Sequence, residues 1–387
     1  MTRLLRALPV PSGQTVLGLL PRLAELLDGR GDAVLPVPAD DADHAHFLAS
    51  ELSADEPIAD DVAVVISTSG TTGKPKGAML TGQALTASGT ATATRLGGPG
   101  QWLLALPPHH IAGMQVLLRS IQAGSDPVVL DVSTGFSVPD FVRAVAEMTG
   151  SRRYISLVAT QLVKALGDAE ASEALASFDA VLLGGGPLPA TVAIRAAQAR
   201  VPVVRTYGMS ETCGGCVYDG VALDGVEVRI GPEGRISLGG ATVATGYRNI
   251  PEHKAFAEHG WFHTDDFGEL DEGRLRGWDA WTRPSAPAGS PWSRRWWRPH
   301  SAPIRWSPTA PSSVYPMTGS ANVSPPQWCR RRREPRPWKI YGSMSPRRWT
   351  ARRHRASYTC LTNSPVAVSG NWTAVHLSNA SLDLKLT

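Results

Sequence analysis

The chain is poor in cysteine. Its 387 residues include four cysteines, which is too few for the disulfide scaffold of a small secreted domain. Cys213 and Cys216 form a C-x-x-C pair, but no second pair follows at the spacing of a zinc ribbon. A metal or redox site therefore stands here as an alternative to two ordinary loop thiols.

Long hydrophobic runs are also absent. No stretch approaches the ~18 apolar residues of a membrane-spanning helix. Pro9, Pro11 and Gly13 interrupt the apolar run at the N-terminus, which makes it a poor signal peptide. We therefore expect a cytoplasmic protein without a membrane span.

Acidic residues are nearly absent from the end of the chain. Residues 276–387 hold 18 Lys/Arg and 3 Asp/Glu, a balance of +15, whereas residues 1–275 hold 20 and 31, a balance of −11. The later part also contains 10 of the 12 tryptophans and 14 of the 31 prolines. Such a switch marks a boundary. Basic residues among aromatics are a nucleic-acid signature, but no recognised module presents them, so we expect no specific nucleic-acid binding.

Before this boundary, short β-branched runs alternate with helical patterns. The expected strands are residues 61–67, 102–107, 127–130, 154–158 and 180–184, and the expected helices are residues 14–29, 140–148 and 190–199. This alternation predicts an α/β fold with a largely parallel sheet and flanking helices. From Gly225 on, short strands with tight turns predict a small β subdomain over about residues 222–275.

The strongest chemical signal is residues 67–80, which read Ser-Thr-Ser-Gly-Thr-Thr-Gly-Lys-Pro-Lys-Gly-Ala-Met-Leu. Glycines allow the backbone N–H groups to curl toward a polyphosphate, while the hydroxyls and two lysines add donors and positive charge. A Walker loop is excluded, because Gly70 and Gly73 stand too close together and Pro75 replaces the Mg-binding hydroxyl of G-x-x-x-x-G-K-S/T. The alternative is a flexible Ser/Gly loop, which rarely carries Lys-Pro-Lys-Gly directly after a buried strand.

This segment closely resembles the phosphate loop of the adenylate-forming superfamily, which includes acyl-CoA synthetases, luciferases and peptide-synthetase adenylation domains. The resemblance implies that residues 1–275 form the large N-terminal domain of that fold and bind ATP with Mg²⁺. It assigns the ATP phosphates to Thr68, Ser69, Gly70, Thr71, Thr72, Gly73 and Lys76. Of these, Thr72 and Lys76 would take part in catalysis together with Glu211.

Two further segments resemble the family's acyl and adenine loops. Residues 107–113, Pro-Pro-His-His-Ile-Ala-Gly, match P-x-x-H-x-x-G and place His110 beside the acyl substrate. Residues 184–189, Gly-Gly-Gly-Pro-Leu-Pro, follow a predicted strand. By resemblance, Gly184 borders the acyl group, and Gly185 and Gly186 border the adenine.

The remaining matches concern the nucleotide. Residues 207–212 read Tyr-Gly-Met-Ser-Glu-Thr, and residues 260–268 resemble W-F-x-T-G-D-x-G. The resemblance implies that Tyr207, beside Gly208, stacks on adenine and that Asp266 accepts the ribose hydroxyls. It also assigns Glu211 to Mg²⁺, and Ser210 and Thr212 to the α-phosphate region. Asp265 stands where many relatives have glycine.

The family pattern breaks after residue 275. The family's G-R-x-D-x-I hinge and the G-K segment that supplies its catalytic lysine are missing from residues 276–387 as written, and its small C-terminal α+β domain is not recognisable. Codons for residues 277–291, read from the third base, permit Leu/Val-Gly-Arg-x-Asp-x-Ala-Ile/Val-x-Thr-Gly-Gly-Val-x-Val, which is the hinge. The same offset at residues 368–373 permits x-Gly-Lys-Leu-Asp-Arg. We hypothesise a single frameshift near codons 273–277; the alternative is a genuine basic tail.

The implied reaction has two steps, formation of an acyl-adenylate from a carboxylate and ATP, then displacement of AMP by coenzyme A. Residues 106–117 look most like o-succinylbenzoate–CoA ligases of menaquinone synthesis. That substrate has two carboxylates, so a second cation is expected, with Arg119 and Arg205 as candidates. Other acyl- or aryl-CoA synthetases, and a nucleotide-binding remnant with little activity, remain alternatives. Relatives are often homodimers, which makes a homodimer a family expectation.

Overall fold

The computed structural model describes residues 2–68 and 74–277. All of them belong to one compact unit. The predicted hinge and lysine segments therefore lie outside the described residues. Among the described residues, no helix is long and apolar enough to cross a membrane.

The first sheet has five strands in the order β1-β2-β3-β4-β14. Its strands are Leu5–Val10, Ala33–Pro38, Val62–Thr68, Lys76–Thr81 and Gly246–Tyr247. β1, β2 and β3 are parallel, whereas β3 and β4 form an antiparallel pair in which Thr68 lies opposite Lys76. This pair places the two ends of the predicted phosphate loop side by side.

The second sheet has seven strands in the order β11-β10-β9-β8-β7-β5-β6. Its strands in chain order, β5 to β11, are Gln101–Leu104, Val128–Val129, Arg153–Val158, Ala180–Gly184, Val203–Met209, Gly214–Tyr218 and Val221–Ala222. The strands β5 to β9 pair in parallel, and β10 and β11 continue the sheet in antiparallel fashion. The expected strand at residues 127–130 is therefore shorter than predicted.

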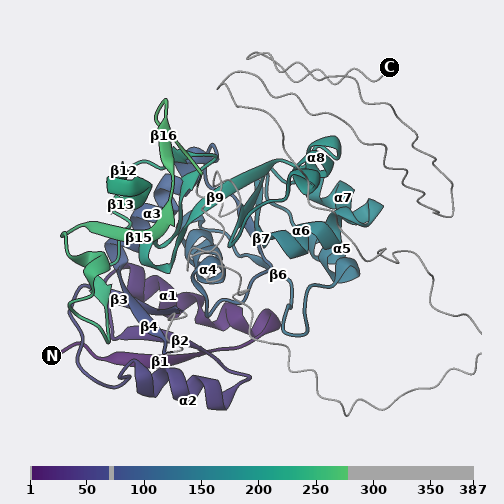
Figure 1. Cartoon of the computed structure of the whole chain (residues 1–387). Helices are drawn as coiled ribbons and strands as arrows, with labels where there is room; N and C mark the ends of the chain where they lie inside the picture. Colours follow the sequence, from purple (N-terminus) through teal and green to yellow (C-terminus); the bar gives the residue numbers. More distant parts are fainter. Residues whose placement is uncertain (1, 69–73, 278–387) are drawn as a thin grey trace, which may run out of the picture. The chain divides into compact units, whose positions relative to one another are not determined.

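Helices cover both faces of this second sheet (Figure 1). The helices α1 to α4 are Leu20–Leu27, Ala42–Glu51, Gly82–Arg95 and Ile111–Ala123, and α5 to α8 are Val138–Ala146, Ala159–Leu166, Ala169–Ala176 and Ala190–Gln198. Trp102 and Leu104 of β5 face the core shared with α1, α3 and α4, whereas Leu103 faces the core of α5 to α8. The helix α2 packs on the outer face of the first sheet.

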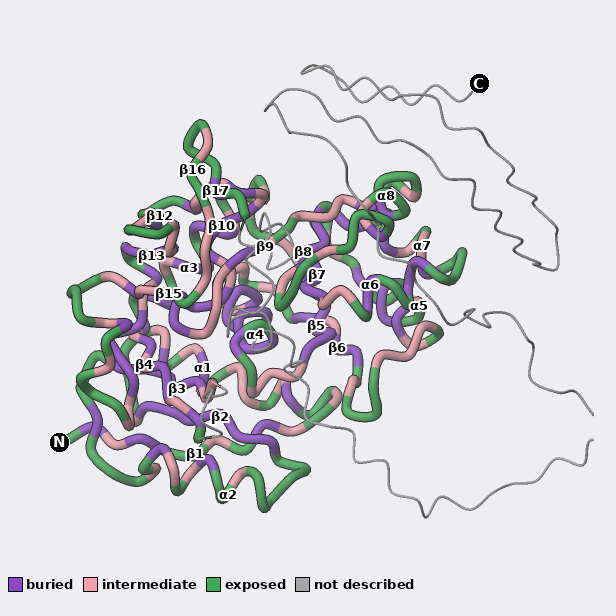
Figure 2. The backbone as a smooth tube through the Cα atoms, viewed as in Figure 1, coloured by how far each residue is buried: buried purple, intermediate pink, exposed green. Residues whose placement is uncertain are grey.

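The core between the two sheets consists of buried apolar side chains. Val64 and Ile66 of β3 and Leu117 of α4 are fully buried in it, and Figure 2 shows these elements largely buried. Burying each such side chain contributes roughly 1.5–3 kcal/mol. The core therefore fixes α4 against both sheets.

The last described strands form smaller sheets. Strands β12 (Val226–Ile230), β13 (Arg235–Gly240) and β15 (Trp261–Phe267) make an antiparallel sheet. Strands β16 (Glu269–Asp271) and β17 (Arg274–Arg276) make a hairpin. Leu275 of this hairpin is 1% exposed, and its N–H donates to Gly220 O at 2.7 Å. The hairpin is therefore packed against the rest of the described fold.

One expected helix differs in the structure. In place of a single helix over residues 14–29, the chain forms a 3₁₀ segment, η1 (Gly13–Leu19), followed by α1. Pro21 lies in the first turn of α1, where its missing N–H costs no hydrogen bond. Proline thus starts a new helix here.

Candidate active site

The predicted nucleotide loops meet where the two sheets face each other. β8 ends at Gly184 and β9 at Met209, and because these strands are parallel, the loops after them leave the same edge of the sheet. The short helix η2 (Ser210–Thr212) follows β9 and packs against β3 and β4 of the other sheet. Glu211 is thereby brought to the stem of the phosphate loop.

The predicted adenine and ribose residues are in direct contact. The Tyr207 hydroxyl donates to Asp266 Oδ2 at 2.9 Å, and the backbone N–H of Asp266 donates to Thr264 Oγ1 at 3.0 Å. Burial raises the pKa of Asp266 above its usual value, and the Tyr207 hydroxyl offsets part of this rise. Gly208 lies against the turn at Gly214, where a Cβ would be 2.1 Å from a carbonyl oxygen. A side chain at residue 208 is therefore excluded.

The predicted Mg²⁺ ligand is a buried carboxylate. Glu211 is 6% exposed, and its Oε1 accepts a hydrogen bond from the Tyr247 hydroxyl at 2.6 Å. Thr212 differs from its predicted role at the α-phosphate. Its hydroxyl is fully buried, donates to Gly214 O at 2.8 Å and accepts from Met209 N at 3.0 Å. The structure therefore uses Thr212 to close the turn that presents Glu211; Ser210 beside it is half-buried.

The described part of the phosphate loop is its stem. Ser69, Gly70, Thr71, Thr72 and Gly73 lie outside the described residues, so their predicted roles stay predictions. Of the two lysines, Lys76 donates to the Tyr247 hydroxyl at 3.3 Å, whereas Lys74 is exposed near Glu51.

The stem also contains an unpaired hydroxyl. Thr68 Oγ1 is buried and has no hydrogen-bond partner among the described residues. The Thr68 hydroxyl and the buried Glu211 carboxylate are hard oxygen donors of the kind that Mg²⁺ prefers. The residues present therefore fit a Mg²⁺–ATP complex.

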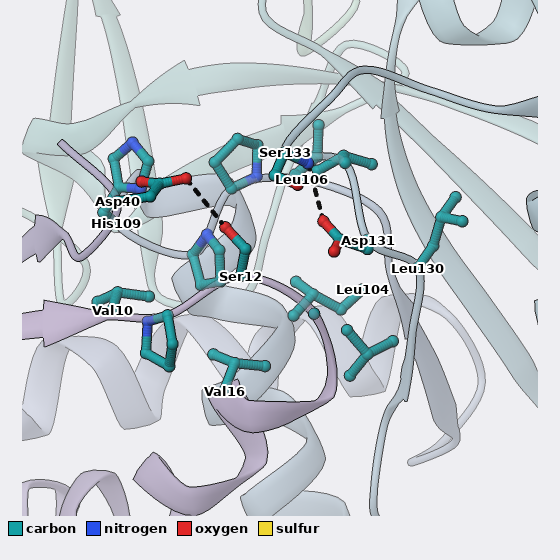
Figure 3. A pocket seen from close by; sticks show the side chains of 16 residues that line it. Val10, Ser12, Val16, Asp40, Leu104, Leu106, His109, Leu130, Asp131 and Ser133 are labelled. Carbon is teal, nitrogen blue, oxygen red and sulfur yellow. Dashed lines mark hydrogen bonds between the residues drawn. The ribbon is translucent and has the colours of Figure 1, made fainter.

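The acyl motif begins α4. His110 is the exposed N-cap residue of this helix, and its ring lies 4.3 Å from that of His109. A Cβ on Gly113 would lie 2.5 Å from Pro107 O, so the helix and the preceding loop need glycine to pack together. Burial lowers the pKa of His109 to about 4. A cavity of 160 Å³ adjoins His109, with Asp40 and Ser12 at one end and Asp131 at the other (Figure 3).

One face of α4 continues the motif with buried polar groups. Gln115 donates to Cys213 O at 2.8 Å, and one turn later Arg119 donates to the Tyr218 hydroxyl at 3.5 Å. Arg119 is 6% exposed and forms no ion pair with any described residue. Gln115 Oε1 and Arg119 Nε lack hydrogen-bond partners among the described residues. This face therefore holds a buried cation whose partners among the described residues are the Tyr218 hydroxyl and the Trp102 ring, 5.2 Å from the guanidinium carbon.

The other candidate cation lies elsewhere. Arg205 is on the exposed side of β9, 4.0 Å from Asp219. The structure does not bring it to the Tyr207, Glu211 and Asp266 cluster. Gly184 is half-buried at the end of β8, and Gly185 and Gly186 are exposed beyond it.

The C-x-x-C pair lies beneath the site. Cys213 and Cys216 are both buried free thiols, and burial raises the pKa of Cys216 to about 12. Within residues 2–68 and 74–277, no three histidine, cysteine or acidic side chains are grouped so that they could hold a metal ion.

Comparison with known proteins identifies the family. The family model described as AMP-binding enzyme matches residues 20–248, more than half of the chain. The chain therefore belongs to the AMP-binding enzyme family, and the expected superfamily and α/β fold are confirmed.

The similar proteins within this family include 2-succinylbenzoate–CoA ligases. The probable 2-succinylbenzoate–CoA ligase of Mycobacterium tuberculosis is 57% identical over 269 residues, which cover 70% of this chain and 69% of that protein. The structure of o-succinylbenzoate CoA synthetase (MenE) from Bacillus subtilis in complex with the acyl-adenylate intermediate OSB-AMP matches with a TM-score of 0.59 and 26% identity, covering 71% of this chain and 85% of that one. The same enzyme in complex with ATP and magnesium ion matches with a TM-score of 0.55 and 26% identity, over 70% and 68% of the two chains.

Proposed function

We propose that this chain is an ATP-dependent acid–CoA ligase that activates o-succinylbenzoate in menaquinone biosynthesis. The observation that carries the proposal is the similarity to the probable 2-succinylbenzoate–CoA ligase of Mycobacterium tuberculosis, 57% identical over 269 residues, in a chain that joins Tyr207 to Asp266 and buries Glu211. Arg119, buried on α4, stays the candidate for the second carboxylate, because a dianionic acid would supply a counter-charge to it.

The nucleotide residues have separate tasks. Asp266 accepts the ribose hydroxyls, the Tyr207 ring lies against adenine, and Thr68 and Lys76 donate to the phosphates. Glu211 holds Mg²⁺, which when bound neutralises charge on the phosphates. Donors fixed in advance of the reaction stabilise the charge on the departing pyrophosphate.

The reaction needs no protein nucleophile. One substrate carboxylate oxygen attacks the α-phosphorus of ATP, and the bond to pyrophosphate breaks. The sulfur of coenzyme A then attacks the acyl carbon, and AMP leaves. The chain's contribution to these steps is orientation and electrostatics, with His110 at the reacting end of α4 and Arg119 nine residues further along it, about 13.5 Å by helical rise.

Acid binding tests the proposal. Calorimetric titration of the full chain, saturated with AMP, should show tighter binding of o-succinylbenzoate than of benzoate or octanoate. Arg119→Met should weaken o-succinylbenzoate binding by about tenfold, the cost of one lost charge-assisted hydrogen bond, and should leave benzoate binding unchanged. Arg205→Met is the matched control, because its side chain is exposed beside Asp219, and it should bind all three acids as wild type does. Preference for a simple monoacid would contradict the proposed substrate.

A nucleotide-binding remnant is the second candidate. It is favoured by one observation, that residues 276–387 as written lack the family's lysine segment. In that case the nucleotide pocket persists while adenylation is severely reduced.

Location and assembly complete the proposal. We expect the chain in the cytoplasm, where its small-molecule substrates are made and used, and as a homodimer on the family pattern. Sedimentation of the purified chain at monomer mass would exclude the dimer.

A further inference from the structure

One short segment, residues 246–249, connects the phosphate-loop stem with the Mg²⁺ ligand. Strand β14 pairs with β4 opposite Met79 and Ala78, and the Arg248 N–H donates to Gly77 O at 2.7 Å. Lys76 and Tyr247, which meet here, are 171 residues apart in the chain. The segment lies outside the motifs of the family resemblance, so its contacts need a separate explanation.

Tyr247 forms a hydrogen-bonded chain between two opposite charges. It is 1% exposed, and its hydroxyl donates to Glu211 Oε1 at 2.6 Å and accepts from Lys76 Nζ at 3.3 Å. The donor and acceptor roles in these two hydrogen bonds are fixed, because an ammonium can only donate, an ionised carboxylate can only accept, and the hydroxyl has one proton. Lys76 also lies 4.5 Å from the centroid of the same ring, a favourable cation–π distance.

This arrangement keeps the two charges apart. Among the described side chains, Lys76 and Glu211 form no direct ion pair, because the Tyr247 hydroxyl stands between them. The remaining N–H groups of Lys76 and the second oxygen of Glu211 are left for a phosphate and for Mg²⁺. Without the hydroxyl, the ammonium and the carboxylate would attract each other directly.

Asn249 fixes the backbone on both sides of Lys76. Its Nδ2 donates to Pro75 O at 2.9 Å, and its Oδ1 accepts from Gly77 N at 3.3 Å. The side chain of Arg248, which lies between Tyr247 and Asn249 in the sequence, points away from the loop stem and donates to Pro57 O and Ser53 O. The segment therefore presents two side chains to the phosphate-loop stem and one away from it.

We propose that Tyr247 and Asn249 are positioning residues for ATP binding: Tyr247 holds Lys76 and Glu211 at the separation that Mg²⁺–ATP requires, and Asn249 holds the loop stem. This inference rests on the proposed nucleotide site. It assigns different effects to the two residues, since only Tyr247 contacts the carboxylate.

The experiment is calorimetric titration of the full chain with ATP, with and without Mg²⁺. In the wild type, Mg²⁺ should tighten ATP binding. Tyr247→Phe should reduce this enhancement by about tenfold, the effect of one hydrogen bond to a charged group. Asn249→Ala should weaken ATP binding by about fivefold both with and without Mg²⁺, and so leave the enhancement intact. A general loss of structure would not separate these two patterns.

Arg248→Ala is the matched control, because it removes two hydrogen bonds from the same segment without touching the loop stem through its side chain. It should bind ATP as wild type does in both conditions. An unchanged Mg²⁺ enhancement in Tyr247→Phe, wild-type ATP binding in Asn249→Ala, or an equal loss in Arg248→Ala would each overturn the inference. A wild-type chain that binds no nucleotide would overturn the proposed function and the inference together, whereas failure of the variants alone leaves the proposed function standing.

Discussion

Tyr207 and Asp266 come from strands of two different sheets, yet their side chains share a hydrogen bond of 2.9 Å. The phenol occupies one oxygen of the carboxylate and orients it. Burial makes ionisation of Asp266 costly, and a bound ribose would repay this cost with two hydroxyl donors. With the proposed ribose role, nucleotide binding is coupled to ionisation of Asp266.

This coupling predicts a pH dependence. Because the ribose hydroxyls bind the ionised carboxylate, AMP affinity should fall as the pH drops through the pKa of Asp266, which lies above its usual 3.8. In the free protein the sign is opposite, since the raised pKa means that folding favours the protonated carboxyl and that stability falls as the pH rises through this window. Asp266→Asn should weaken AMP binding by about tenfold at neutral pH.

Titration calorimetry with AMP from pH 4 to 8 would measure this dependence. The wild type and Asp266→Asn should be titrated at the same salt concentration. The Asp266→Asn chain should show a flat profile over the acid side. A wild-type profile with no acid decline would contradict the ribose role.

At the scale of elements, α4 is the part of the site that depends most on close packing. Gly113→Ala would place a methyl group 2.5 Å from Pro107 O and 2.7 Å from Leu106 O. Neither carbonyl is the end of a flexible side chain, so the first turn of α4 and His110 must shift. We expect a loss of about 1–3 kcal/mol in unfolding free energy and weaker acid binding.

Chemical denaturation followed by tryptophan fluorescence would measure the loss. Gly18→Ala is the control, because no atom lies within 4 Å of its added Cβ. Equal stability of Gly113→Ala and wild type would refute the packing argument.

The sequence predicted helices and strands best where a local residue pattern alone determines the backbone conformation. The β-branched run at residues 61–67 became β3, and the glycine-rich motif at residues 184–189 marked the end of β8 correctly. Strands β1 and β2 were missed, since Pro9, Pro36 and Pro38 lie within them and proline argues against a strand. Tyr247 and Asn249 were missed because their role depends on pairing with a strand 171 residues earlier, which no local pattern reveals.

At the scale of the whole molecule, the described fold and the family resemblance end at nearly the same place. The last described strand, β17, ends at Arg276, and the proposed frameshift lies near codons 273–277. The described residues of the proposed nucleotide site therefore all precede the change in composition. If residues 276–387 are made as written, the second candidate applies, and we predict that the chain binds ATP or AMP but exchanges pyrophosphate far more slowly than an intact relative.

Isotope exchange between pyrophosphate and ATP, with o-succinylbenzoate present, would measure this rate. A variant gene with the shifted frame restored is the control and should recover exchange. Exchange by the unaltered chain at the rate of an intact relative would contradict the prediction. Sequencing codons 273–277 tests the frameshift itself, because an unshifted frame with the present codons would rule out a sequence error and leave a real frameshift or a real tail.

The late pairing of β14 with β4 also sets an order of events during synthesis. Residues 33–81 leave the ribosome early, but the partner that completes their sheet and holds Lys76 arrives only with Tyr247. Contacts of such sequence separation form slowly, and domains fold as units during translation. The proposed nucleotide site is therefore completed only after the seven-stranded sheet has been synthesised. A nascent chain that ends before about residue 250 would lack this site and could not be stabilised by bound ATP.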